Sequence, residues 1–163
     1  MARVSIPDLN RMRAEKKKIV VMTAYDFSMA QLIDRAEVDM ILVGDSGGRN
    51  LLGHEDYNSV TMDEMVLMTR SVSRGSKHAL VIGDMPFMSY QVNKEEAIRN
   101  AGRLIQEGEA QAVKLEVGAE YAPTVEAIVK AGIPVMAHMG LTPQTSMGSG
   151  GFRSAEAQVT EEK

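Results

Sequence analysis

The sequence predicts an α/β fold with a parallel sheet, because short apolar runs alternate with helical stretches along its 163 residues. Three of these runs stop on a carboxylate: residues 40–44 precede Asp45, 80–83 precede Asp84, and 112–115 precede Glu116. Short, continuous runs rich in β-branched residues are typical of buried parallel strands. Parallel strands share one direction, so the three acids are expected at the edge of the sheet where βα folds bind ligands.

The N-terminal part of the chain is expected to form a capped helix, a strand and a second helix. Ser5 and Pro7 have the residue types of an N-cap and a first turn, so a short helix begins there. Residues 19–23 are the expected first strand, and 27–36 the following helix. One face of that helix carries the small and apolar residues Ala30, Leu32, Ile33 and Ala36.

The middle of the chain repeats the strand-helix alternation twice. A long glycine-containing loop is expected after Asp45, and Thr61 and Glu64 then form a capping box that begins a helix. Gly75 is expected to stop this helix, and the strand after it ends at Asp84. Asn93 caps the next helix. The inward-facing residues of these two helices are expected to be Met65, Met68, Val72, Ile98, Ala101 and Ile105.

The last βα units follow the same pattern. A strand carries Lys114 and Glu116, a helix with Val125, Ile128 and Val129 facing inward ends at Gly132, and residues 133–137 form a strand that ends at His138. Three strands are preceded by a small residue, a spacer and an apolar residue, with Glu37, Glu109 and Gly132 as the spacers. A left-handed backbone at the spacer would suit glycine and cost each glutamate roughly 1 kcal/mol.

Length and composition bound the class of protein. A closed eight-stranded barrel takes roughly 250 residues, so residues 1–163 are expected to form a single domain, either an open sheet or a barrel without its last third. A net charge of −4 argues against nucleic acid or an anionic membrane as a partner. No apolar stretch approaches the length of a membrane span. The absence of cysteine excludes thiolate chemistry and suits a cytoplasmic protein.

Asp45, Asp84 and Glu116 together indicate a site for a hard cation, most plausibly Mg²⁺. A single acid at a strand end is usually a cap or loop residue, but three in succession favour a metal site. Lys114 and Glu116 lie two residues apart on one strand and therefore face the same side. A buried ion pair without chemistry is the alternative interpretation of that pair.

Ser46 lies in a Gly-Asp-Ser-Gly-Gly segment that matches the nucleophile signature of chymotrypsin-like proteases. That class needs its histidine before the serine, whereas all three histidines follow Ser46, so we reject it. The glycines more plausibly let an anionic ligand approach Ser46. His138 ends a strand and is either a site residue or a structural histidine. Residues 148–151 are either a lid or a linker.

Five short motifs run in order along the chain: Thr23-Ala24-Tyr25-Asp26, Val43-Gly44-Asp45-Ser46, Gly83-Asp84-Met85-Pro86-Phe87-Met88, Val113-Lys114-Leu115-Glu116 and His138-Met139-Gly140-Leu141-Thr142-Pro143-Gln144. With these motifs the sequence resembles the ketopantoate hydroxymethyltransferase (3-methyl-2-oxobutanoate hydroxymethyltransferase) family over about residues 6–153. The resemblance implies a (β/α)₈ TIM barrel of the phosphoenolpyruvate mutase/isocitrate lyase superfamily, of which this chain holds about the first five βα units.

The resemblance also implies an activity: transfer of a hydroxymethyl group from methylenetetrahydrofolate to 2-oxoisovalerate, on the way to pantothenate, by a homo-oligomer. Asp45, Asp84 and Glu116 would surround Mg²⁺ directly or through water, and Asp45, Ser46, Asp84 and Lys114 would contact the 2-oxo acid. Lys114 and His138 are the candidate catalytic residues. The metal would stabilise the enolate formed when C3 loses its proton, and Lys114 would add positive charge.

Several positions depart from the family pattern. The deprotonating glutamate of the family lies on a later strand than any in this chain, so no residue here is assigned that role. Glutamates replace the usual glycines at 37 and 109, and residues 54–59 and 154–156 differ from the family. We therefore expect weak or no turnover from this chain alone. The alternatives are an inactive partial barrel that binds Mg²⁺ or a 2-oxo acid or self-assembles, and a related lyase or mutase.

Overall fold

The computed structural model describes residues 2–145. Its strands are β1 (Val21–Thr23), β2 (Met40–Val43), β3 (Leu80–Asp84), β4 (Ala112–Glu116) and β5 (Val135–His138). Its helices are α1 (Ile6–Ala14), α2 (Phe27–Arg35), η1 (Gly48–Leu52), α3 (Met62–Gly75), α4 (Lys94–Gln106), η2 (Ala119–Tyr121) and α5 (Ala122–Lys130). In this part of the chain, no helix is long and apolar enough to span a bilayer.

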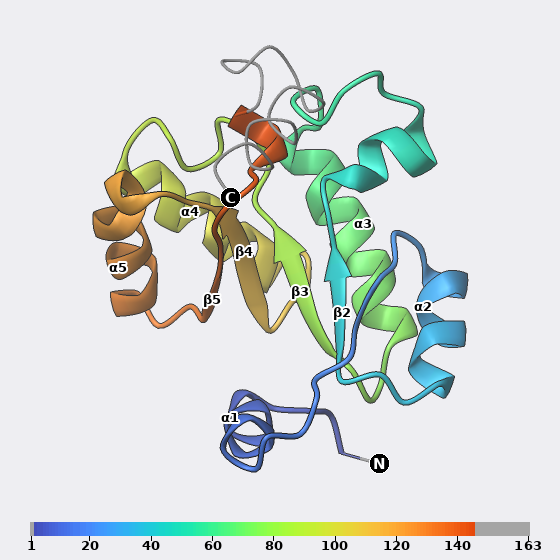
Figure 1. Cartoon of the computed structure of the whole chain (residues 1–163). Helices are drawn as coiled ribbons and strands as arrows, with labels where there is room; N and C mark the ends of the chain where they lie inside the picture. The colour runs from blue at the N-terminus through green and yellow to red at the C-terminus, as the bar shows by residue number, and fades with distance from the viewer. Residues whose placement is uncertain (1, 146–163) are drawn as a thin grey trace, which may run out of the picture.

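The five strands form one parallel sheet in chain order, β1-β2-β3-β4-β5. Helices α2 to α5 cover one side of this sheet, and α1 lies below its amino ends (Figure 1). Each of β1 to β4 is followed by a helix that returns to start the next neighbouring strand, as in the wall of a βα barrel. The predicted α/β class and its five parallel strands are thus confirmed.

The side of the sheet that faces the helices holds the main core. Residues at alternate strand positions, such as Ile41, Val81 and Leu115, are fully buried there against the helices. The predicted inward stripe of α3 (Met65, Met68 and Val72) packs in the same cluster. The Ser5 and Asn93 caps and the Thr61 capping box form as predicted, and Asp8 completes a capping box at Ser5 as well.

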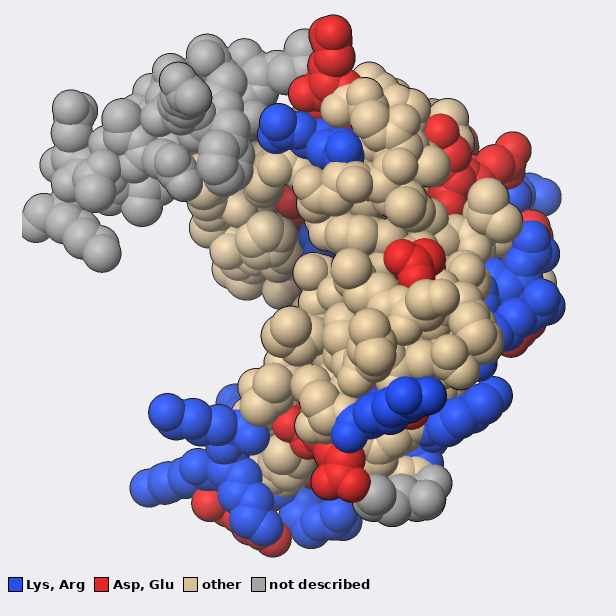
Figure 2. Space-filling model, turned by 90° about the vertical axis from the view of Figure 1, so that its right-hand side faces the viewer, with Lys and Arg blue, Asp and Glu red and all other residues tan. Residues whose placement is uncertain are grey.

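The opposite side of the sheet has a smaller apolar cluster near its amino end. Met40, Leu80, Ile82 and Ala112 are buried there, and Val4 and Leu9 from the α1 segment pack against them. The molecule is hollowed on one side between this lower end and the upper loops (Figure 2). The carboxyl half of the inner surface is therefore the part left open for a ligand.

Helix α3 ends at Gly75, as predicted, but three other local predictions were wrong in detail. The segment after Asp45 was expected to be a loop, whereas Gly48–Leu52 forms a π-helix. Gly75 also has a packing role. A Cβ atom there would lie 2.6 Å from the Phe27 carbonyl oxygen, so glycine permits close packing of α2 on α3. Two side chains expected to face inward, Leu32 and Val129, are 67% and 52% exposed.

The repeated spacer positions do adopt the left-handed backbone. The φ angles of Glu37 and Glu109 are 55° and 61°, and that of Gly132 is 89°. The strain expected at the two glutamates is therefore present. Glu109 has a compensating contact, because Arg74 donates hydrogen bonds to its Oε1 from Nε and Nη2 at 3.1 and 2.9 Å.

Candidate active site

A cavity of about 430 Å³ lies at the carboxyl ends of β2 to β5. The strand register places Asp84 beside Lys114 and Glu116 beside His138, all on the inner side of the sheet. The predicted site residues all line this cavity, together with six further residues: Leu42, Gly44, Tyr57, Met136, Ala137 and Pro143. The lining residues predicted from sequence are Asp45, Ser46, Asp84, Lys114, Glu116 and His138.

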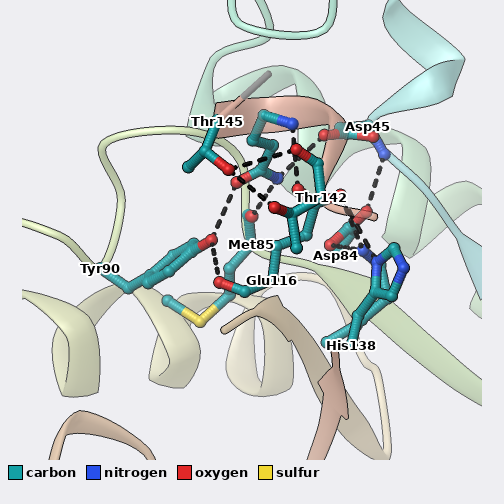
Figure 3. Close-up of polar contacts among 10 residues, drawn as sticks. Asp45, Asp84, Met85, Tyr90, Glu116, His138, Thr142 and Thr145 are labelled. Atoms are coloured by element: carbon teal, nitrogen blue, oxygen red, sulfur yellow. Dashed lines mark hydrogen bonds and ion pairs between the residues drawn. The ribbon is translucent and has the colours of Figure 1, made fainter. Parts of the chain in front are cut away.

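Lys114 is buried among acids. Its Nζ atom lies 2.9 Å from Asp84 Oδ1 and 3.9 Å from Glu116 Oε1. On the far side, His138 Nδ1 lies 3.5 Å from the same Glu116 oxygen (Figure 3). The ammonium of Lys114 thus neutralises only part of the charge of the buried carboxylates around it. The remaining negative charge can attract a metal cation.

The charged groups of the site shift one another's pKa values. Burial raises the pKa of Asp84 to about 7, against the lowering effect of Lys114. Burial also raises the pKa of Glu116. Burial alone would lower the pKa of Lys114, but Asp84, Glu116 and Asp45 outweigh it and raise that pKa. Burial and then Lys114 lower the pKa of His138, so its imidazole is neutral at pH 7.

Ser46 contacts Tyr25, which lies in the loop after β1. Tyr25 Oη and Ser46 Oγ are 3.0 Å apart, and Asn50 Nδ2 on η1 donates to the same tyrosine oxygen at 3.1 Å. The Cβ of any residue replacing Gly47 would lie 2.8 Å from the Tyr25 ring. The glycine therefore allows the ring to reach the serine.

Gln144 is a site residue that the sequence reasoning did not single out. It is 1% exposed and its Nε2 donates to Asp45 Oδ2 at 2.9 Å and to the Met85 carbonyl at 3.0 Å. Its backbone N–H donates to Glu116 Oε2 at 2.9 Å. Its position as the last residue of the family-like motif that begins at His138 was the available signal, but no periodic pattern reveals which way a loop side chain turns.

The donor set fits a hydrated divalent cation rather than a closed protein cage. Asp84 Oδ1 is buried and accepts no hydrogen bond of good geometry, although Lys114 lies beside it. Within residues 2–145, no three His, Asp or Glu side chains converge closely enough to hold a metal together. Mg²⁺ commonly keeps several waters and uses only one or two carboxylates, so these acids suit it when some contacts run through water.

Residues 148–151, expected to be a lid or a linker, lie outside the described residues. His54 lies in the loop after η1, beside Glu64, with 3.0 Å between Nε2 and Oε1. It is not among the residues that line the cavity.

A sequence profile described as ketopantoate hydroxymethyltransferase matches residues 3–163. The chain belongs to the ketopantoate hydroxymethyltransferase family. It is 53% identical over 153 residues to the 3-methyl-2-oxobutanoate hydroxymethyltransferase of Syntrophomonas wolfei, covering 94% of this chain and 55% of that protein. It is 56% identical over 141 residues to the enzyme of the same name from Enterococcus faecalis, covering 86% and 51%. The chain spans about half the length of these curated relatives.

Solved structures share the fold of this member of the ketopantoate hydroxymethyltransferase family. A phosphonopyruvate hydrolase, determined with oxalate and Mg²⁺, aligns with a TM-score of 0.66 at 17% identity, covering 91% of this chain and 58% of that one. A 2,3-dimethylmalate lyase, described as a PEP mutase/isocitrate lyase superfamily member, aligns with a TM-score of 0.62 at 18% identity, covering 94% and 58%.

Proposed function

We propose that this chain carries the metal and 2-oxo-acid half of a ketopantoate hydroxymethyltransferase active site. The observation that carries the proposal is the buried group of Asp84, Lys114 and Glu116 on adjacent strands, with Asp45 and Ser46 beside it in one cavity. Family membership and the resemblance of these motifs support the same reading. The substrate would be 2-oxoisovalerate, and methylenetetrahydrofolate the one-carbon donor.

In this proposal the positive charge of Lys114 faces the oxygen that becomes negative when the substrate loses its C3 proton. A buried ammonium is effective there because the surroundings are of low dielectric. The Ser46 hydroxyl, oriented by Tyr25, would hydrogen-bond the substrate carboxylate. The neutral His138 imidazole would accept a hydrogen bond or a proton at the cavity wall.

Asp45, Asp84 and Glu116 would hold Mg²⁺, directly or through water. When bound, the ion supplies Lewis-acid polarisation of the 2-oxo acid. Homo-oligomeric assembly and a cytoplasmic location belong to the same proposal, because the sequence expectations and family membership are what support them.

Exchange of the C3 proton of 2-oxoisovalerate in D₂O tests the proposal without folate. The proton NMR signal of the substrate is followed with this chain and Mg²⁺, and again with EDTA. Substitution Lys114→Met should abolish any exchange, whereas Lys94→Met, an exposed lysine on α4, should leave it unchanged. Failure of a folded sample to bind either Mg²⁺ or the 2-oxo acid by calorimetry would overturn the proposal.

A binding role without turnover is the second candidate, and one observation favours it. Among the described residues, the only carboxylates that line the cavity are Asp45, Asp84 and Glu116, and each already has a hydrogen-bond or ion-pair partner. No further carboxylate is therefore free to act as a base. Mg²⁺-dependent binding with no proton exchange would support this candidate over the first.

A further inference from the structure

Gln144 connects three strand ends that are far apart in the sequence. Its side chain reaches Asp45 after β2 and the Met85 carbonyl after β3, and its backbone N–H reaches Glu116 at the end of β4. It is one of the largest fully buried side chains of the molecule. A polar side chain buried in this way is stable only when its groups are satisfied.

The orientation of the Gln144 amide is determined by its partners. Asp45 Oδ2 and the Met85 carbonyl oxygen both accept hydrogen bonds here, so the atom that faces them is the NH₂ group. The opposite atom, Oε1, lies 2.9 Å from the Tyr90 hydroxyl, which is itself 2.9 Å from the Glu116 carbonyl oxygen. Figure 3 shows Tyr90 pointing toward this group from the side away from His138. The amide therefore has a single arrangement.

The consequence concerns the oxygens of the three carboxylates. Gln144 donates hydrogen bonds to Asp45 Oδ2 and Glu116 Oε2, each at 2.9 Å. The backbone N–H of Asp45 donates a hydrogen bond to Asp84 Oδ2 at 3.2 Å. Each acid is left with one oxygen that is not held by these amide donors.

We propose that Gln144 is a positioning residue that sets the cation preference of this site by leaving Asp45 and Glu116 one available oxygen each. Mg²⁺ takes six ligands in near-ideal octahedral geometry, keeps water, and suits carboxylates that give one oxygen. Ca²⁺ takes six to eight oxygens and often binds both oxygens of a carboxylate. The inference rests on the proposed function, which supplies the cation.

The experiment measures cation preference rather than activity. Mn²⁺ binding to the metal-free chain is followed by electron paramagnetic resonance, and Mg²⁺ and Ca²⁺ are compared as competitors. Substitution Gln144→Glu keeps the size of the side chain and its backbone N–H but removes the amide donor from Asp45 and adds an oxygen. We expect it to shift the ratio of Ca²⁺ to Mg²⁺ affinity toward Ca²⁺ by at least tenfold.

Two further variants keep the test decisive. Tyr90→Phe removes the hydroxyl that contacts Gln144 Oε1 and the Glu116 carbonyl oxygen, and should shift the ratio in the same direction by a smaller factor. Gln106→Leu, at an exposed position on α4, is the control and should leave the ratio unchanged. Each variant is first shown to be folded by circular dichroism.

The possible failures are distinguishable. If folded Gln144→Glu and Tyr90→Phe chains keep the unsubstituted preference, Gln144 does not set it, and the proposed function is unaffected. If the unsubstituted chain binds no Mn²⁺, the metal part of the proposed function is wrong, and this inference falls with it. If Gln144→Glu does not fold, an unchanged ratio in Tyr90→Phe alone overturns the inference.

Discussion

Two aspartates at opposite ends of β3 have opposite environments. Asp34, on α2, reaches the segment that enters β3 and accepts hydrogen bonds from the Ser76 hydroxyl and from the backbone N–H groups of residues 77–79, at 2.7 to 3.2 Å. Asp84, at the exit of β3, accepts one backbone hydrogen bond, at 3.2 Å, and faces Lys114. Partial burial would raise the pKa of Asp34, but its hydrogen bonds outweigh that effect and lower the pKa to about 2. In contrast, burial raises the pKa of Asp84 to about 7.

The difference separates a carboxylate that stabilises the fold from one that we propose to bind a ligand. A carboxylate whose oxygens are fully used by hydrogen bonds stabilises the fold and has nothing left for a ligand. A buried carboxylate with an oxygen short of donors weakens the fold but can bind a cation. The two ends of the inner sheet surface differ in a similar way. The amino end is filled by Leu80, Ile82 and residues of the α1 segment, whereas the carboxyl end opens into the cavity.

The largest expected effect is loss of stability on Asp34→Ala. The substitution leaves several donors of the segment before β3 without their charged acceptor, so we expect the free energy of unfolding to fall by about 3 kcal/mol. Urea denaturation followed by circular dichroism measures it. Asp63→Ala, at an exposed carboxylate on α3 that pairs with Arg103, is the matched control and should cost less than about 1 kcal/mol. Equal losses in the two variants would mean that the hydrogen bonds of Asp34 stabilise the fold no more than an exposed ion pair does.

Asp84→Asn should act on ligand binding as well as on stability. The amide is close in shape to the carboxylate, but the substitution leaves the buried Lys114 with Glu116, 3.9 Å away, as its ion-pair partner, so the free energy of unfolding should fall by about 2 kcal/mol. Calorimetry should find Mg²⁺-dependent binding of 2-oxoisovalerate weakened at least 100-fold, about 2.7 kcal/mol. A strongly destabilised variant that still binds the ligand would contradict the functional assignment of Asp84.

Most of the fold and part of the site follow from local sequence. The strand ends at Asp84 and Glu116 and the Thr61 capping box depend on residues within a few positions of one another, and all three form as predicted. Parallel pairing then brings the acids together, because the register of adjacent strands fixes their spacing. The edges are less predictable: β1 is shorter than expected and its three residues are exposed.

Gln144 shows why the rest could not be predicted. Its contacts to Asp45, Met85 and Glu116 span 99, 59 and 28 residues, and no periodicity links such distant positions. Asp34 is similar, since an aspartate on a helix surface gives no sign in the sequence that it caps a segment more than 40 residues later. The π-helix after Asp45 was missed because its glycines favour a loop on propensity alone.

Acid unfolding should depend on Asp34. Its folded pKa of about 2 lies below the ordinary value of 3.8, so its contribution is present above pH 4 and is lost as the pH falls toward 2. The shift corresponds to roughly 2.5 kcal/mol at most, and its partial exposure reduces the expected loss to about 1–2 kcal/mol. Unfolding free energies measured from pH 5 to pH 2 should show this slope, and Asp34→Ala should lose it. A slope that survives in Asp34→Ala would assign the acid sensitivity to other carboxylates.

The smallest expected effect is a gain, and it tests whether the amino end of the sheet serves stability alone. Glu37, before β2, has a φ angle of 55°, which glycine adopts without strain. Relief of this strain is partly offset because glycine has more conformational entropy to lose on folding. Glu37→Gly should therefore raise the free energy of unfolding by about 0.5–1 kcal/mol. Glu109→Gly relieves the same strain but loses the Arg74 contact, so its effect should be near zero. Both variants should bind 2-oxoisovalerate and Mg²⁺ like the unsubstituted chain, because neither residue lines the cavity. An equal gain in the free energy of unfolding at positions 109 and 37 would mean that the Arg74–Glu109 pair contributes nothing. Weaker ligand binding in either variant would mean that the two ends of the sheet are energetically coupled.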